Sequence, residues 1–276
     1  MRLTILIPTV NRPKMVRELV ESITRFELDF VDICVSLNGA DIKTVNALTP
    51  FKEKGKIDLL IWHDLLPISK HWDLAIKSVS NELILVLPDD DKLINPNWLL
   101  EIKGYFEKNT NAVIGFGNYE KVDSNGHHLG EVSVSVPSTG TGSALLEIYK
   151  SKFQGYNGFG LPNLCTVFKK NAYHECGGID IECVSPDTYL FCKVLSAGDY
   201  VFSNQIAAKY MIHEDNLSKS INLRLLLSDV KMAIGLTKYL VQKGKLPNSW
   251  WAIRFVWFFI RRFLGALRRQ VLPSGN

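Results

Sequence analysis

The chain has 276 residues, of which 46% are hydrophobic, and its 32 Lys and Arg against 28 Asp and Glu give a formal charge of +4. This length predicts one main core with an appended segment rather than two equal domains, and the small charge argues against a nucleic-acid partner. Five scattered cysteines without CxxC spacing, and an N-terminus without a secretory-signal pattern, predict a reducing, cytoplasmic location.

The first 90 residues alternate short apolar runs with helical patterns. Residues 3–7 (LTILI) are an apolar, β-branched run stopped by Pro8, which is typical of a strand buried on both faces. A helix follows at once, because Asn11 can cap it and Pro13 suits its first turn. Further strands are expected at residues 31–37, 57–62 and 82–87, and a further helix at residues 72–79. This alternation predicts an α/β fold with a mixed, mainly parallel sheet between helices.

The second half of the chain changes from strands to helices. Strands are expected at residues 112–116 and 131–136, and a loop at residues 138–143. From residue 221 the pattern becomes helical, with apolar residues at helical spacing over residues 223–240 and a break at residues 243–247. The sequence therefore predicts an α/β domain of residues 1–220 followed by a C-terminal helical segment of residues 221–276.

Three consecutive aspartates, Asp89, Asp90 and Asp91, follow the apolar run at residues 82–87. Adjacent carboxylates repel one another, and a strand end tolerates them where a cation or water compensates their charge. Mg²⁺ or Mn²⁺ prefers carboxylate oxygens and keeps positions open for substrate phosphates, and open α/β sheets bind ligands at the carboxyl ends of their strands. The alternative is an acidic turn before a helix that starts at Asn95.

Two stretches resemble the inverting glycosyltransferases of family two, which have the GT-A fold. They are LTILIPTVNRPKMVRELVESI at the start and SKHWDLAIKSVSNELILVLPDDDKLINPNWLLEI around the aspartates, and the resemblance extends over residues 1–215. It implies a divalent metal, Mn²⁺ or Mg²⁺, with Asp89, Asp90, Asp91 and His213 as candidate ligands. It also implies a nucleotide-sugar site formed by Pro8, Thr9, Asn11, Arg12, Asn38, Lys70, Asp89 and Asp90.

Some of these positions depart from the family's pattern or have a second interpretation. Members carry an acidic residue at the end of the second strand that contacts the base, whereas Leu37 stands there in this chain. Asn38 can replace it as a hydrogen-bonding group, or it can form an Asn-Gly turn. Lys70 and His71 either approach phosphate or belong to a solvated helix start. His213 either ligates metal or has a structural role.

The acceptor side of the site is implied by a second part of the resemblance. Residues 163–180 (NLCTVFKKNAYHECGGID) resemble the strand and loop that line the acceptor pocket, so Gly177 and Gly178 are expected to bind the acceptor, although they can also simply end a helix. Asp187 occupies the position at which inverting members present their general base, and a carboxylate at a helix start can be aimed rigidly. Its alternative role is to cap the helix after Pro186.

The C-terminal residues 249–272 predict an amphipathic, basic helix. One side carries Arg254, Arg261, Arg262, Arg268 and Arg269, and the other carries Val256, Phe259, Ile260, Phe263, Leu264, Leu267 and Val271. The arginines interrupt any run long enough to span a bilayer, so the helix is expected to lie in the membrane interface. Tryptophans suit the headgroup level, and they are Trp250, Trp251 and Trp257. The alternative is that the apolar side packs on the α/β domain or on a second subunit of a homodimer.

Together these features predict a metal-dependent inverting glycosyltransferase. It would move a sugar from a UDP-sugar to a lipid-linked or growing glycan at the inner face of the cell membrane, in bacterial surface polysaccharide assembly such as that of O-antigen or capsule. One rival is an inactive, membrane-docked scaffold protein, which Leu37 favours. The other is a sugar-1-phosphate nucleotidyltransferase, which would need a glycine-rich loop after the first strand, whereas residues 8–12 (PTVNR) contain no glycine.

Overall fold

One mixed sheet organises the computed structural model, which describes all residues except 40, 154–160, 214–222, 250 and 272–276, with the backbone alone for residues 149–153, 262 and 265–271. In the described part the strand order is β3-β2-β1-β4-β9-β6-β10-β5, with β7 paired to β6 and β8 paired to β10. The strands are β1 (Leu3–Thr9), β2 (Val31–Asn38), β3 (Asp58–Trp62), β4 (Leu83–Val86), β5 (Lys92–Leu93), β6 (Ala112–Asp123), β7 (His128–Val132), β8 (Thr139–Thr141), β9 (Thr166–Lys169) and β10 (Asp199–Ile212).

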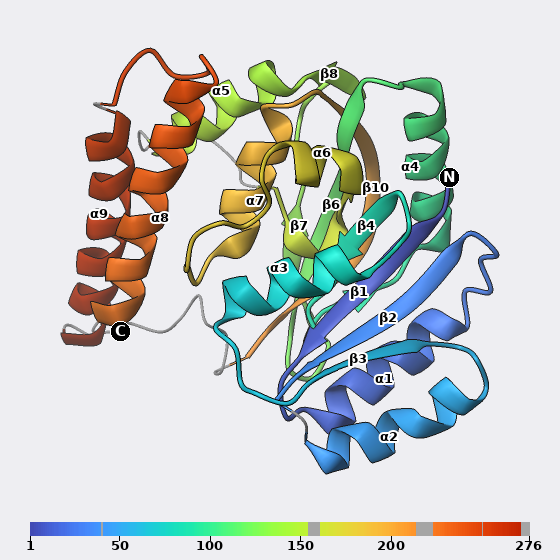
Figure 1. Ribbon diagram of the computed structural model, residues 1–276. Helices are drawn as coiled ribbons and strands as arrows, with labels where there is room; N and C mark the ends of the chain where they lie inside the picture. The colour runs from blue at the N-terminus through green and yellow to red at the C-terminus, as the bar shows by residue number, and fades with distance from the viewer. Residues whose placement is uncertain (40, 154–160, 214–222, 250, 272–276) are drawn as a thin grey trace.

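Helices cover both faces of this sheet (Figure 1). They are α1 (Pro13–Thr24), α2 (Ile42–Glu53), α3 (Ile68–Ser78), α4 (Pro96–Lys108), α5 (Gly142–Phe153), the short 3₁₀ turn η1 (Asn163–Cys165), α6 (Lys170–Glu175), α7 (Pro186–Leu195), α8 (Leu223–Gln242) and α9 (Trp251–Val271). Strands β3, β2, β1 and β4 run parallel to one another, β9 is antiparallel to β4 and β6, and β10 is parallel to β6. The predicted mixed, mainly parallel α/β architecture is therefore what the structure shows.

The first strand explains why two separate cores form. Ile5 and Ile7 point to the face that α1 covers with Val16, whereas Leu6 points to the opposite face, where it joins Trp72 of α3. Alternate residues of a strand lie on opposite faces, so an uninterrupted apolar run is stable only where helices cover both. The carboxyl ends of β1 and β4 are thereby held rigidly between two layers of helices.

Three local expectations were wrong. The residue that caps α1 is Arg12, not Asn11, and Asn11 instead has a left-handed backbone with φ 51°. The strand expected at residues 131–136 is β7, which runs from His128 to Val132, because it pairs with the long β6 rather than following local pattern. The loop expected at residues 138–143 contains β8 and the start of α5, because residues 139–141 pair with β10.

The C-terminal helices form an antiparallel pair that lies against α7 (Figure 1). Phe255 and Phe259 of α9 are buried in the same core as Leu236 of α8 and Leu190 of α7. The expectation that Phe259 faces a membrane was therefore wrong, since a turn of 100° per residue also places it towards α8. The predicted division of the chain at residue 220 stays a prediction. None of the helices in the described ranges has the length and apolarity needed to cross a bilayer.

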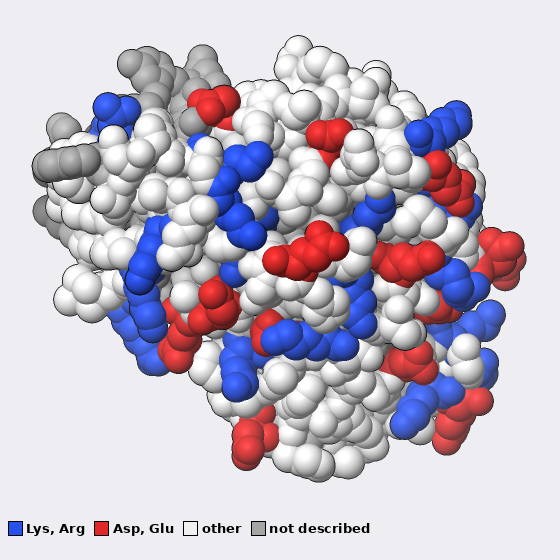
Figure 2. Space-filling model, turned by 45° about the horizontal axis from the view of Figure 1, so that its top comes forward, with Lys and Arg blue, Asp and Glu red and all other residues white. Residues whose placement is uncertain are grey.

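The outer side of α9 combines apolar and basic groups. Ile253, Trp257 and Leu264 are exposed, and Arg254 and Arg261 lie exposed among them. Trp250 and the side chains of Arg262, Leu267, Arg268, Arg269 and Val271 lie outside the described residues. Over the face that Figure 2 presents, Lys and Arg are interspersed with Asp and Glu. All five cysteines are free and buried.

Candidate functional site

The ends of β1 and β4 bring the first two candidate residues together. The two strands pair in parallel, with Leu6 opposite Val86, so the residues that follow them leave the sheet at the same edge. There Thr9 donates a buried hydrogen bond from Oγ1 to Asp89 Oδ2 at 2.5 Å. Pro8 is half-buried beside them in β1. The carboxyl ends of neighbouring parallel strands therefore form one edge of the site, as expected for an open α/β sheet.

Arg12 supplies the positive charge that the aspartates need. Its Nη1 donates to Asp89 Oδ1 at 2.8 Å and to Asp90 Oδ2 at 3.3 Å. The left-handed turn at Asn11 directs the chain so that Arg12 stands at the start of α1, facing the aspartates. The predicted nucleotide-site residues Thr9 and Arg12 thus contact the predicted metal ligands directly.

The last strand of the sheet completes this group. Asp91 is buried, and its Oδ1 accepts a hydrogen bond from the Met211 amide at 3.2 Å. His213, just after β10, places Nε2 at 3.0 Å from Asp90 Oδ2. Burial raises the pKa of Asp91 well above its ordinary value, and it also raises the pKa of Asp89 against the opposing effects of Thr9 and Arg12. We call these residues the aspartate cluster; they are Thr9, Arg12, Asp89, Asp90, Asp91 and His213.

The chemistry of the aspartate cluster fits a divalent cation at Asp90 and His213. No group of three His, Cys, Asp or Glu side chains converges as a complete ligand set within the described residues. A hard cation such as Mg²⁺ or Mn²⁺ nevertheless takes only one or two protein groups when phosphate oxygens and water fill its other positions. The Asp90 side chain is 18% exposed, against 6% for Asp89. Its Oδ2 atom also lies within hydrogen-bond distance of the His213 imidazole, which is a second possible metal ligand.

Asn38, Lys70 and His71 lie near the ends of β2 and β3. The Asn38 amide donates to Leu66 O at 2.9 Å and accepts from Leu66 N at 2.8 Å, and the following Gly39 has a positive φ of 79°. Lys70 is exposed in the first turn of α3. His71 is buried with Nε2 at 2.7 Å from Ser36 Oγ, so both interpretations of it, a phosphate contact and a solvated helix start, were wrong. A ring bonded inside the protein has no path to a ligand in solvent.

The two glycines end α6 and continue into an irregular segment. Gly177 and Gly178 have φ values of 80° and 62°, which favour glycine. A Cβ atom on Gly178 would lie 2.9 Å from Asp73 Oδ1 and from the Tyr173 ring, so the backbone approaches these groups as only glycine allows. The helix-ending alternative is therefore what the backbone shows, while acceptor binding stays a prediction.

Asp187 stands in the first turn of α7, after Ser185 at the N-cap and Pro186 at the first helical position. The N-cap role considered for Asp187 therefore falls to Ser185. Just before it, Cys183 N donates to Ser69 Oγ at 3.2 Å, at the start of α3. Because α3 follows the carboxyl end of β3, the start of α7 lies at the same edge of the parallel strands as the aspartate cluster.

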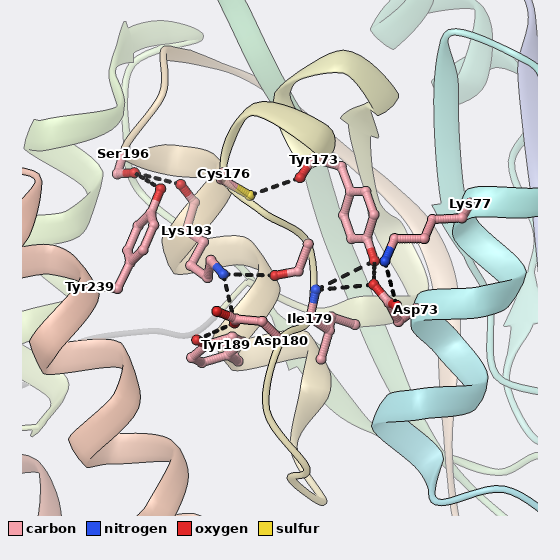
Figure 3. Close-up of polar contacts among 11 residues, drawn as sticks. Asp73, Lys77, Tyr173, Cys176, Ile179, Asp180, Tyr189, Lys193, Ser196 and Tyr239 are labelled. Atoms are coloured by element: carbon pink, nitrogen blue, oxygen red, sulfur yellow. Dashed lines mark hydrogen bonds and ion pairs between the residues drawn. The ribbon is translucent and has the colours of Figure 1, made fainter.

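Sequence reasoning missed a second polar group, which surrounds the loop after α6. It includes Asp73, Tyr173, Asp180, Tyr189 and Lys193 (Figure 3). The available signal was Lys193, a charged residue inside the apolar run of α7. A buried lysine requires partners, but the sequence could not identify them.

Comparison with known proteins identifies the family. Residues 4–177, more than half of the chain, match the model of a family described as Glycosyl transferase family 2. The chain belongs to this family. It is thus a glycosyltransferase, and the matched part includes Thr9, Arg12 and all three aspartates but ends before Asp187 and His213. The nucleotidyltransferase alternative was therefore wrong.

Solved structures confirm the predicted GT-A-like fold. The structure is similar to residues 1–349 of TarS from S. aureus, with a TM-score of 0.66 and 13% identity over 100% of this chain and 76% of that one. For TarS in complex with UDP-GlcNAc the TM-score is 0.69 at 14% identity, with 96% and 73% covered. A mannosyltransferase from Pyrobaculum calidifontis, in complex with GDP-Man and Mn²⁺, gives 0.56 at 12% identity, with 100% and 76% covered. A search of curated proteins found no match.

Proposed function

We propose that this family 2 glycosyltransferase transfers a sugar from a nucleoside-diphosphate sugar, with UDP as the expected nucleotide, to a hydroxyl of a lipid-linked or growing glycan, with inversion. The observation that carries the proposal is the convergence of Arg12, Asp90 and His213 where β1, β4 and β10 end. A guanidinium matches phosphate oxygens, and a carboxylate with an imidazole suits a divalent cation. The complexes of similar structures with UDP-GlcNAc and with GDP-Man and Mn²⁺ support this assignment.

Within the aspartate cluster each side chain has a distinct task. Asp90 and His213 would hold Mn²⁺ or Mg²⁺, and such an ion, when bound, neutralises charge on the departing diphosphate. Thr9 fixes the Asp89 carboxylate, and Asp89 in turn holds the Arg12 guanidinium at 2.8 Å. Arg12 has five donor hydrogens, so it can bind a phosphate oxygen while it keeps its bond to Asp89.

On the acceptor side, Asp187 would take the proton of the attacking hydroxyl. Direct displacement at the anomeric carbon needs a base on the face opposite the leaving group. The Ser185 and Pro186 backbone fixes the start of α7, so the Asp187 carboxylate is held in the first turn of a helix. The N-terminus of a helix also favours a negative group in its first turn, which is where Asp187 stands.

The acceptor class is inferred from the outer side of α9. Ile253, Trp257 and Leu264, together with Arg254 and Arg261, offer apolar and cationic groups to an anionic lipid surface. A peripheral position on the inner face of the cell membrane would place the active centre beside lipid-linked glycans, as in the assembly of a bacterial surface polysaccharide. The other occupant of this face would be a second copy of the chain in a homodimer.

The decisive experiment is a donor screen on the purified full chain. Nucleotide release would be measured from UDP-GlcNAc, other UDP-sugars and GDP-mannose, with Mn²⁺ or Mg²⁺ and a membrane lipid extract as acceptor. We expect Asp187→Asn to lower transfer by about 10²- to 10⁴-fold, as for a lost general base. Asp90→Asn should lower it by about 10²- to 10³-fold through lost stabilisation of the leaving group.

The matched control is Asp29→Asn, an exposed aspartate at the opposite end of the sheet, which should leave transfer unchanged. Nucleotide binding without release from any donor would favour the inactive scaffold alternative. Wild-type transfer by Asp187→Asn would exclude that residue as the base.

A further inference from the structure

A buried lysine lies behind the acceptor side of the proposed active centre. The Lys193 side chain is 1% exposed, yet its Nζ donates to Gly178 O at 2.8 Å and to Asp180 Oδ1 at 2.9 Å. Nζ also lies 4.8 Å from the ring centres of both Tyr189 and Tyr239. Figure 3 shows the ammonium between these groups, so α7 contacts the loop after α6 and helix α8 through one side chain.

The same loop is also held from its opposite side. The Ile179 amide donates to Asp73 Oδ1 of α3 at 3.3 Å, and the Tyr173 hydroxyl donates to the same oxygen. Lys77 donates to the other oxygen of Asp73 at 2.7 Å (Figure 3). Residues 177–180 are therefore clamped between α3 and α7, and a Cβ atom on Gly178 would lie 2.9 Å from Asp73 Oδ1.

The Asp180 carboxylate connects the loop to two side chains of α7. It accepts from Lys193 and, at 2.6 Å, from the Tyr189 hydroxyl. Although burial opposes the change, these hydrogen bonds hold the pKa of Asp180 below its ordinary value. The side chain is 59% exposed, so an ionised Asp180 remains solvated even without its partners.

Stability alone does not account for an ammonium at this position. Moving a charged group out of water is costly, and apolar residues of similar volume often replace a buried ion pair without loss of stability. What an apolar residue at position 193 would remove is the directional bond to the Gly178 carbonyl. The advantage of lysine is therefore one defined conformation for the loop.

That conformation extends to Asp187. After the clamp, the amides of Cys183 and Val184 donate to Ser69 Oγ of α3 at 3.2 Å and to Ser228 Oγ of α8 at 2.9 Å. Ser185 Oγ then donates to Asp229 Oδ1 at 3.1 Å. Residues 177–185 are thus fastened at intervals to α3, α7 and α8 before α7 begins.

We propose that Lys193 is a positioning residue for the acceptor side, which holds residues 177–185 through the Gly178 carbonyl and the Asp180 carboxylate so that Asp187 faces the acceptor hydroxyl. This inference rests on the proposed function, in which Asp187 takes the proton of that hydroxyl. The aspartate cluster and Lys193 would then have separate tasks. The aspartate cluster binds the donor, and Lys193 affects only the position of Asp187 on the acceptor side.

The test compares Lys193→Met with Lys170→Met in the full chain. Lys170 is a fitting control, because its Nζ also donates to backbone carbonyls, those of Lys77 and Val79, away from residues 177–185. Backbone hydrogen exchange is measured first and requires no ligand. Peptides that span residues 177–185 should exchange roughly tenfold faster in Lys193→Met and at the wild-type rate in Lys170→Met.

Activity gives the second readout, with UDP-GlcNAc and then the other donors of the screen. Lys193→Met should lower transfer to the lipid extract by about 10- to 100-fold, as for a misplaced catalytic group, and change acceptor-free donor hydrolysis less than about twofold. A general structural defect would reduce both rates together, and that result would overturn the proposal. Unchanged exchange over residues 177–185 would overturn it as well.

Two further comparisons distinguish a failure of this proposal from a failure of the proposed function. If Lys193→Met does not fold, Asp180→Asn replaces it, since this exposed side chain tolerates substitution; it should shift exchange and transfer in the same directions, with a transfer loss of about threefold to tenfold. An Asp180→Asn protein with wild-type exchange and transfer would exclude the clamp. If no donor releases nucleotide with the wild-type chain, the proposed function fails, while the exchange comparison still decides whether Lys193 holds the loop.

Discussion

Three neighbouring aspartates have three different environments in this protein. Asp89 is held by Thr9 and Arg12, and Asp91 is buried against the β10 backbone. Asp90 is the most exposed of them and contacts both Arg12 and His213. Since a metal ion needs an accessible carboxylate, we propose Asp90 as the principal ligand of the three, with Arg12 and His213 as the side chains that contact it.

A buried histidine makes the protein sensitive to acid. His71 donates or accepts at Ser36 Oγ, which also accepts from Trp62, and burial lowers its pKa to about 4. In the unfolded chain His71 binds a proton near pH 6.5, but in the folded protein it does so only near pH 4. The contribution of His71 to stability is therefore nearly constant above pH 6.5 and falls between these two values. We expect His71 to contribute a loss of roughly 2 kcal/mol by pH 4.5.

Urea unfolding at pH 7 and pH 4.5 measures this effect as a difference between variants. His71→Gln should lose less stability on acidification than the wild type, by that amount. His174→Gln changes an exposed residue of α6 and should behave as the wild type does. Equal acid sensitivity of His71→Gln and the wild type would show that the ring is not held neutral.

For individual residues, the sequence predicted which side chains the ends of neighbouring strands bring together. Asp89 follows one apolar strand and Thr9 ends another, and a parallel sheet places both at one edge, so their proximity could be inferred. Asp73 and Tyr173 are 100 residues apart, and their contact depends on how α3 and α6 pack. No local pattern carries this information, and a lysine such as Lys193 is exposed in most helices.

At the scale of elements, the end of α6 depends on two glycines with different surroundings. Both need a positive φ, which costs any other residue about 1 kcal/mol. A Cβ on Gly178 would also meet Asp73 and Tyr173 at 2.9 Å, whereas on Gly177 the nearest atom is Lys193 Nζ at 3.9 Å. We therefore expect Gly178→Ala to destabilise the protein by about 2–4 kcal/mol and Gly177→Ala by about 1 kcal/mol.

Chemical unfolding of the two alanine variants checks this order. Both variants place alanine at a positive φ, so each is the control for the other. The difference between their losses of stability measures the cost of the close contact of a Cβ on Gly178 with Asp73 and Tyr173. Equal losses would mean that Tyr173 and Asp73 move aside without cost.

Helix α9 divides its apolar residues between two sides. Phe255 and Phe259 pack inwards, while Ile253 and Trp257 are 57% and 54% exposed. Burying a large apolar side chain contributes roughly 1.5–3 kcal/mol, and about 1.4 kcal/mol is tenfold in affinity. We therefore expect Ile253→Gln with Trp257→Gln to weaken binding to phosphatidylglycerol-containing vesicles at least about tenfold, as measured by co-sedimentation.

These outward substitutions leave the core intact, so the thermal unfolding midpoint should change little. Leu129→Gln is the matched control, because Leu129 of β7 is equally exposed, at 54%, but lies on another element. Binding should also weaken with added salt, since Arg254 and Arg261 attract anionic lipid. Vesicle binding that is unaffected by the double substitution would count against this face, and a change of oligomeric state instead would favour the homodimer alternative.

For the whole molecule, the regular β/α units could be predicted from the sequence, whereas strand pairing between distant segments could not. The runs that form β1 to β4 carry their own apolar pattern, so their strands were predictable. The short strands β5 and β8 exist because β10 pairs with them, and the sequence around them reads as a loop. The same limit applies to the C-terminal helices, whose amphipathic pattern does not reveal what covers the apolar side.

The packing of those helices makes a prediction about the entire fold. Six large apolar side chains beyond residue 220 are buried in the common core: Met232, Leu236, Leu240, Leu246, Phe255 and Phe259. At roughly 1.5–3 kcal/mol each, they contribute about 9–18 kcal/mol, a gross upper bound that the conformational entropy of ordering the two helices offsets in part. Because removal of α8 and α9 would also expose the apolar surface of α7 that packs against them, we expect residues 1–220 alone not to fold cooperatively.

We expect the fragment of residues 1–220 to show no cooperative urea transition by near-ultraviolet circular dichroism, whereas the full chain unfolds in one. A matched pair within α9 tests the same claim without truncation. Phe255→Ala should cost about 3–5 kcal/mol by opening a core cavity, and Trp257→Ala, on the exposed side, about 0.5 kcal/mol or less. A cooperative transition of the fragment, together with equal effects of the two alanines, would mean that the helical pair is an independent appendage. A large loss confined to Phe255→Ala would instead establish that α8 and α9 belong to the same core as α7, the helix that carries Asp187.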